Sequence, residues 1–129
     1  MNHPVRPTGI APPAAAYELG VVSSAGSRML HSAGIVGARP DGSVPDGIED
    51  QAREVWHSIL ALLAEAGFET SDIVSYTTYV VAGEELGPVM AARDAALRPH
   101  TAASTLVTVP ALARPEWKVE VAVIAARTD

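Results

Sequence analysis

The side chains that could do chemistry in this chain are mainly hydroxyls and imidazoles, because the 129 residues include no cysteine. Disulfides, thiolate zinc sites and cysteine nucleophiles are therefore excluded. Ser32 has no histidine and aspartate at a spacing that predicts a nucleophilic serine. His100 lies in a predicted loop, where an imidazole is either a general acid–base catalyst or simply solvated. His31, His57 and His100 show no His-x-x-x-His spacing, so no metal site is predicted.

The composition narrows the expected partners. The formal net charge is −6 and no segment concentrates basic residues, so nucleic acid is not an expected partner. The first eight residues carry two prolines and no apolar run, unlike a signal peptide. No apolar stretch approaches the roughly 20 residues of a membrane helix, so we expect a cytoplasmic protein without a membrane partner. Charged residues are few for such a small domain. This low number indicates either a surface that is partly buried in an oligomer or simply an alanine-rich composition.

The chain begins with a proline-rich segment, residues 1–13, that we expect to be extended. Each proline fixes its own φ and disfavours helix in the residue before it. Two short apolar runs follow at residues 17–23 and 27–34, and Ser24-Ala25-Gly26 separates them. This pattern predicts two antiparallel strands joined by a tight turn.

The longest predicted helix follows Pro45. Asp46 can cap its start, and Glu49 three residues later completes a capping-box pattern. An apolar stripe with helical spacing comes next, and Gly67 suits a left-handed cap at the end. The stripe consists of Ile48, Ala52, Val55, Trp56, Ile59, Leu60 and Leu63.

Four more elements complete the chain. Residues 73–81 are rich in β-branched and aromatic side chains, which indicates a strand. Residues 84–97 predict a helix that starts near Gly87, because the proline after this glycine is tolerated only in a first turn. Residues 104–109 and 118–125 predict two further strands.

The order strand-strand-helix-strand-helix-strand-strand fits one domain, residues 1–129. Two helices cannot cover both faces of a sheet of five or six strands, so we place both on one face of an α+β fold. The other face must meet water or another subunit. Both sides of residues 118–125 are largely apolar, which favours an oligomer whose subunits pack sheet to sheet.

Several short segments, taken in their order and spacing, resemble the Rid (YjgF/YER057c/UK114) family. The similarity runs from about Pro13 to Ala126, although no single segment is specific alone. The matching segments are Ala15-Ala16-Tyr17 with Gly20-Val21, Leu30-His31-Ser32-Ala33-Gly34, Asp41-Gly42 with Gln51-Ala52, Ala66-Gly67, Asp72-Ile73-Val74, Thr78-Tyr79-Val80, Ala103-Ser104-Thr105-Leu106-Val107 and Val119-Glu120-Val121.

The resemblance implies a chorismate-mutase-like α+β fold with a mixed or antiparallel sheet, assembled as a homotrimer. It also implies a small ligand in each cleft between adjacent subunits, and substrates that are reactive imines, enamines or related metabolites. It implies no metal or organic cofactor. Tyr17 and Ser32 match the family's pocket tyrosine and serine, and Gly34 leaves room for a ligand near the backbone. The structural alternatives are a core aromatic for Tyr17 and a small strand residue for Ser32.

Two departures from the family set the expected chemistry. In the family's deaminases an arginine on the penultimate strand grips the substrate carboxylate, and the matching position here is Ser104. No small residue reproduces that guanidinium fork. The family's glutamate near the attacking water aligns with Ala122, while Glu120 matches an earlier acid. Glu120 and Ala122 lie about 7 Å apart along a strand, so one cannot simply replace the other.

We therefore predict an enzyme that acts on a labile imine, enamine or related metabolite by hydrolysis, tautomerisation or cyclisation, without the usual arginine–glutamate pair. Two alternatives stay open, namely a trimer that only binds a ligand or partner, and an ordinary 2-imino acid deaminase that uses other residues. The catalytic candidates are Tyr17, Ser32 and His100, and the candidate ligand contacts are Ser104, Thr105, Gly34 and Glu120.

Overall fold

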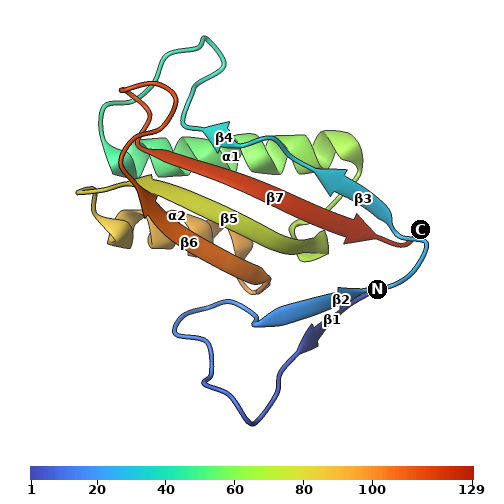
Figure 1. Ribbon diagram of the computed structural model, residues 1–129. Coiled ribbons are helices and arrows are strands. Elements are labelled where there is room, and N and C mark those ends of the chain that lie inside the picture. Colours follow the sequence, from blue (N-terminus) through green and yellow to red (C-terminus); the bar gives the residue numbers. More distant parts are fainter.

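A computed structural model describes residues 1–129 and shows two helices packed on one face of a five-stranded sheet (Figure 1). The strand order is β3-β7-β5-β6, and the short β4 also pairs with β7. Only β5 and β6 are parallel, so the sheet is mixed. The α+β class and the placement of both helices on one face are confirmed. The elements of this layer pair are β3 (Arg28–His31), β4 (Ile35–Val36), α1 (Ile48–Ala66), β5 (Ile73–Val81), α2 (Leu86–Leu97), β6 (Ala103–Val109) and β7 (Val119–Arg127).

Helix α1 forms where the apolar stripe predicts it, but its first cap differs. Gly47, with φ −88° and ψ 148°, occupies the N-cap position, and no side chain caps the helix. Asp46 lies one residue too early to accept the first free N–H groups, so the predicted capping box is wrong. At the other end, Gly67 has φ 78° and its N–H bonds back to Ala64, which confirms the left-handed cap.

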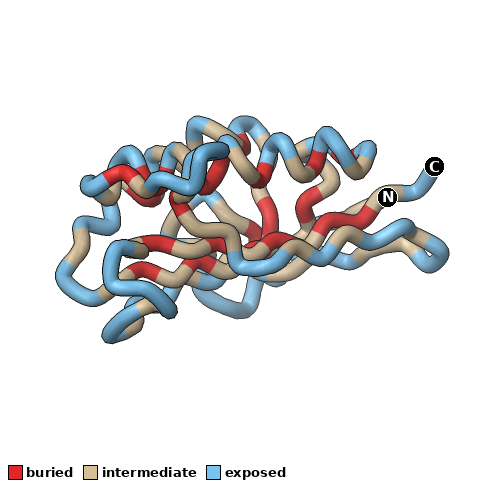
Figure 2. The backbone as a smooth tube through the Cα atoms, turned by 90° about the horizontal axis from the view of Figure 1, so that it is seen from above, coloured by how far each residue is buried: buried red, intermediate tan, exposed pale blue.

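Strand β7 organises the core because it pairs with three of the other strands of its sheet. Its alternate residues Val119, Val121, Val123 and Ala125 are at most 1% exposed and face the helices. Figure 2 shows the buried residues concentrated where the helices meet the sheet. The opposite face of β7 is only half-buried along Glu120, Ala122 and Ile124, so a face of mixed polarity stays open in one chain.

The predicted hairpin between the two N-terminal runs is wrong. Strand β2 (Gly20–Ser23) pairs with β1 (Asn2–Val5), forming a separate two-stranded ribbon below the main sheet in Figure 1. Strand β3 instead pairs with the end of β7, which puts Leu30 opposite Ala125 against the core. The turn at residues 24–26 lies where the sequence predicts it, but β3 pairs with residues 124–127 of β7 and not with β2.

A short 3₁₀ helix, η1 (Thr70–Asp72), leads into β5. Helix α2 starts at Leu86 with Gly87 and Pro88 in its first turn, as predicted. Neither α1 nor α2 combines the length and the apolar character that a membrane crossing would need.

Candidate functional site

The first group of candidate residues lies where β3, β4 and β7 meet. The Ser32 hydroxyl donates to the Ala33 carbonyl at 2.8 Å and accepts from the Val123 N–H at 2.8 Å. The Ser32 N–H also donates to the Val123 carbonyl at 2.9 Å. Ser32 therefore extends the β3–β7 ladder by one residue, and its hydroxyl proton is already engaged within the chain.

Glu120 lies beside this junction on the open sheet face. Its carboxylate covers Gly34, where a Cβ would stand 2.6 Å from the Glu120 Cδ atom. The close approach therefore requires glycine at residue 34 if the carboxylate keeps its position. We call Ser32, Gly34 and Glu120 the β7 half-site.

The second group lies at the beginning of β6, on the other edge of the sheet. The Glu18 N–H donates to the Ala102 carbonyl at 2.8 Å, and Glu18 forms an isolated parallel bridge with Ala103. The segment around Tyr17 is thus fixed beside β6. We call Tyr17, Glu18 and the residues next to them the β6 half-site.

Glu18 is only 6% exposed, and its charge is balanced within this half-site. Arg6 donates to both carboxylate oxygens, from Nε to Oε1 at 3.0 Å and from Nη2 to Oε2 at 2.6 Å. The Thr101 hydroxyl donates the third hydrogen bond to this carboxylate, at 2.6 Å from Oε2. The hydrogen bonds from Arg6 and then Thr101 lower the pKa of Glu18 to about 2. The bidentate pair holds residues 6–18 as a closed loop.

A cavity of about 650 Å³ lies between this loop and the start of β6. Its wall includes Ile10, Pro12 and Pro13 from the proline-rich segment, together with Tyr17 and Thr101. The Tyr17 hydroxyl accepts a hydrogen bond from the exposed Ala14 N–H at 3.3 Å, and its own proton stays free to be donated. The cavity thus combines apolar and hydrogen-bonding side chains, and small-molecule sites use such polar groups to orient a ligand.

His100 lies on the other side of the Arg6–Glu18 pair, in a smaller cavity of about 280 Å³. Its Nε2 atom is 2.8 Å from the Ile73 carbonyl oxygen. A carbonyl only accepts, so Nε2 carries the hydrogen and Nδ1 is the basic nitrogen when the ring is neutral. This bond fixes the ring to β5 and leaves Nδ1 as the only atom of His100 suited to proton transfer.

Ser104 and Thr105 point to opposite faces of the sheet. Ser104 pairs in register with the buried Tyr76, on the helix side, and is half-buried. Thr105 pairs with Thr77 and is exposed on the open face. Thr105 therefore shares the open face with Glu120, although β5 lies between their two strands.

A single chain does not bring the candidate residues together. The β7 half-site lies on the β3 side of the sheet, and the β6 half-site lies at the opposite edge. In the strand order, β7 and β5 lie between the two edge strands β3 and β6. The sequence reading missed Arg6, Glu18 and Thr101. One signal was available, because a glutamate inside the apolar run after Tyr17 needs a charged partner if it is buried.

Comparison with known proteins identifies the family. Residues 8–127 match the model of the family described as endoribonuclease L-PSP. The Rid-family protein YyfB of Yersinia pestis, of unknown function, has 26% identity and a TM-score of 0.89, covering 98% of both chains. A putative endoribonuclease of Thermotoga maritima has 25% identity and a TM-score of 0.74, covering 95% of this chain and 92% of its own.

A third structure, E. coli TdcF with bound serine, has 24% identity and a TM-score of 0.72, and it covers 95% of this chain and 93% of its own. A search of curated proteins found no match. The match over residues 8–127 and the named structural neighbours agree with the resemblance read from the sequence. This chain belongs to the endoribonuclease L-PSP family, and the solved structures that resemble it include proteins named as members of the Rid and YjgF/YER057c/UK114 families.

Proposed function

We propose that the protein is a homotrimeric small-molecule enzyme whose ligand binds where the β6 half-site of one subunit meets the β7 half-site of the next. The separation of Tyr17 and Glu120 across the sheet supports this proposal most strongly, because each half-site holds only part of the set of candidate site residues. The open sheet face supplies the surface for assembly. It exposes apolar side chains such as Met29 (47%) and Val107 (39%), which a subunit contact would remove from water.

The chemistry of the half-sites favours an uncharged or weakly polar ligand. Arg6 is the one arginine beside the Tyr17 cavity, and its guanidinium is already paired with Glu18. Glu120 adds a negative charge on the open face. A substrate carboxylate would therefore meet no free positive partner, whereas a neutral group can accept a hydrogen bond from the Tyr17 hydroxyl.

The proposed reaction class is hydrolysis, tautomerisation or cyclisation of an imine, an enamine or a related labile metabolite. In hydrolysis, water adds to the C=N carbon while the nitrogen gains a proton, and the C–N bond then breaks to give a carbonyl compound and an amine. Tyr17 can orient the substrate nitrogen or oxygen and donate a hydrogen bond to it, whereas His100 lies in the smaller cavity across the Arg6–Glu18 pair and does not line the Tyr17 cavity. TdcF, which shares this fold, has serine bound, which supports a small metabolite as the size class of the ligand but not its charge.

An assay with two matched substrates tests this proposal. The probes are 2-iminopropionate and its uncharged primary amide, assayed beside an arginine-containing relative. The relative's arginine can form two hydrogen bonds to the substrate carboxylate, whereas this chain has Ser104 at the matching position. At about 1.5–3 kcal/mol per hydrogen bond, that loss predicts roughly thousandfold lower activity on the acid than the relative shows. We expect this protein to prefer the amide. Comparable rates of the two proteins on the acid would contradict the proposed ligand class, and binding of the amide without turnover would indicate a ligand-binding protein.

The family description raises RNA cleavage as another activity. The net charge of −6 disfavours binding to a phosphate backbone, and four of the arginines are paired with acidic groups, namely Arg6, Arg28, Arg53 and Arg127. The small-metabolite reading therefore remains the better supported one.

A further inference from the structure

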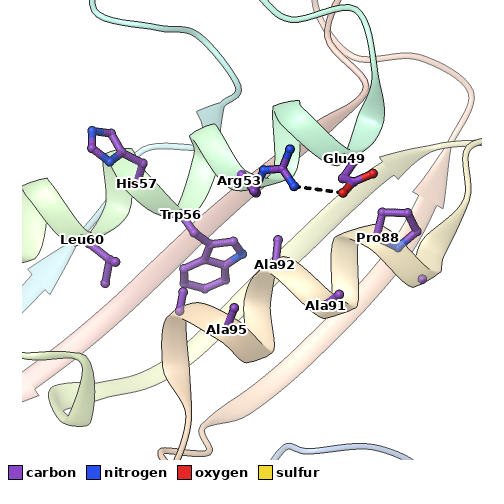
Figure 3. A pocket seen from close by; sticks show the side chains of 11 residues that line it. Glu49, Arg53, Trp56, His57, Leu60, Pro88, Ala91, Ala92 and Ala95 are labelled. Atoms are coloured by element: carbon purple, nitrogen blue, oxygen red, sulfur yellow. Dashed lines mark hydrogen bonds and ion pairs between the residues drawn. The ribbon is translucent and has the colours of Figure 1, made fainter.

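A third cavity lies on the outer side of the molecule, between the two helices (Figure 3). Its volume is about 630 Å³, within the range of small-molecule sites. Trp56 and Leu60 of α1 line one side, and Ala91, Ala92 and Ala95 of α2 line the other. The alanines keep α2 from filling the space. We call this cavity the interhelical groove.

Trp56 forms the floor of the groove and leaves one polar group unpaired. The residue is only 3% exposed, and its ring packs edge-on against Tyr76 with centroids 5.7 Å apart. The Trp56 indole N–H makes no hydrogen bond in the structure. It is also not one of the fully enclosed side-chain atoms that lack a partner, because those atoms are only Asn2 Oδ1 and Tyr76 Oη. The Trp56 N–H is therefore still reached from outside, and Figure 3 shows the ring nitrogen on the side of α2.

The charges at the mouth of the groove balance one another. Arg53 pairs with Glu49 at 2.9 Å and also with Asp50. His57 adds an imidazole at the edge. A ligand carboxylate finds no free cation here, and a ligand cation would have to compete with Arg53 for its two acids. The groove thus offers an apolar wall and a single unpaired, nearly buried donor.

We propose that the interhelical groove binds a small neutral molecule with a flat apolar body and a carbonyl-type acceptor that takes the Trp56 indole N–H. The body lies against Leu60 and the alanines of α2. The hydrogen bond satisfies a donor that otherwise stays nearly buried without a partner, which is the costly state for a polar group. This site lies on the helix side of the sheet, away from Tyr17 and Glu120, and is independent of the proposed catalytic cleft.

The test follows the indole proton directly. In ¹⁵N-labelled full-length protein carrying Trp117→Phe, Trp56 gives the only indole N–H resonance, because the chain has two tryptophans. The probe is acetophenone, and toluene serves as the probe without an acceptor. We expect saturable binding of acetophenone with a millimolar or tighter Kd, and a downfield shift of the indole proton that toluene does not produce.

Two matched variants make the result specific to the groove. Ala91→Leu fills the groove from an exposed position on α2 and should weaken acetophenone binding at least about tenfold. Ala61→Leu adds the same side chain at an exposed position of α1 outside the groove and should leave binding unchanged. The remaining amide resonances report whether each variant is folded. No indole shift up to about 10 mM acetophenone, or an equal shift in folded Ala91→Leu, would overturn the proposal.

Discussion

The carboxylate of Glu120 lies directly over Gly34, in the space that a side chain at residue 34 would occupy. This relationship joins two residues 86 positions apart and fixes where one negative charge sits on the open sheet face. Gly34 has no positive φ, so the glycine serves the close approach of the Glu120 carboxylate and not a special backbone conformation.

Gly34→Ala is expected to displace the Glu120 carboxylate without unfolding the protein. The atoms that a new Cβ would meet belong to the flexible Glu120 side chain, which can rotate away. We predict a stability change below about 1 kcal/mol and weaker ligand binding or turnover. Urea unfolding at fixed protein concentration measures the stability change, and the assay with the primary amide of 2-iminopropionate measures turnover. Unchanged activity in the folded variant would remove Glu120 from the proposed site.

Gly37→Ala provides the structural contrast. A Cβ at residue 37 would stand 2.8 Å from the Cα, Cβ and carbonyl oxygen of Gln51, and helix backbone cannot rotate away. Overpacking of this kind costs typically about 1–3 kcal/mol. We therefore expect Gly37→Ala to be clearly less stable than Gly34→Ala, and equal urea midpoints for the two variants would contradict the packing described.

Gln51 is fully buried and joins three separate segments. Its Nε2 donates to the carbonyls of Pro45 and Glu116 at 2.7 and 2.9 Å, and its Oε1 accepts from the Lys118 N–H at 2.9 Å. Gln51→Leu leaves these backbone groups unpaired, so we predict a loss of about 2–4 kcal/mol in the free energy of unfolding. Urea unfolding measures it, with Glu65→Leu as an exposed control on α1. A loss no greater than that of the control would contradict this role.

Ser32→Ala should affect stability, whereas Tyr17→Phe should not. The Ser32 hydroxyl accepts from the Val123 N–H inside the sheet, and its removal costs about 1–2 kcal/mol. The Tyr17 hydroxyl accepts only from the exposed Ala14 N–H, so its loss should change stability by less than about 0.5 kcal/mol while lowering ligand affinity. Thermal unfolding and ligand titration separate the two effects. Full ligand binding by Tyr17→Phe would exclude this hydroxyl from the site.

The Arg6–Glu18 pair predicts a specific acid sensitivity. The folded-state pKa of Glu18 is lowered from an ordinary 4.5 to about 2. Its contribution to stability is therefore present above pH 4.5 and is lost as the pH falls toward 2. We expect wild type to exceed Glu18→Gln in stability at pH 6, with the difference shrinking toward pH 2. Urea unfolding across this range checks the trend, with exposed Glu65→Gln as the control, and a difference that does not vary with pH would contradict it.

Local pattern was enough to predict most of the elements. Residues 73–81 form β5 with the predicted bounds, and the start of α2 lies where the proline requires it. The end of α1 follows from Gly67, whose positive φ is a property of the residue itself. These features depend on neighbours a few residues apart, which is the information that spacing and propensity contain.

The features that the sequence reading missed depend on distant partners. The partner of β3 lies about a hundred residues away in β7, so the apolar run 27–34 identified a strand but not its neighbour. The contact between Glu18 and Thr101 likewise spans 83 residues. Ser32 and Gly34 were found through the family motif, yet the bonds that engage the Ser32 hydroxyl follow from the β3–β7 register and not from the motif.

Sedimentation velocity of the unmodified protein at micromolar concentration tests most directly whether two half-sites from neighbouring subunits form the cleft. Our account predicts a single species of about 40 kDa, three times the chain mass of 13.4 kDa, because the open sheet face is buried between subunits. A species of 13.4 kDa at the same concentration would contradict it, since Tyr17 and Glu120 would then never share a site.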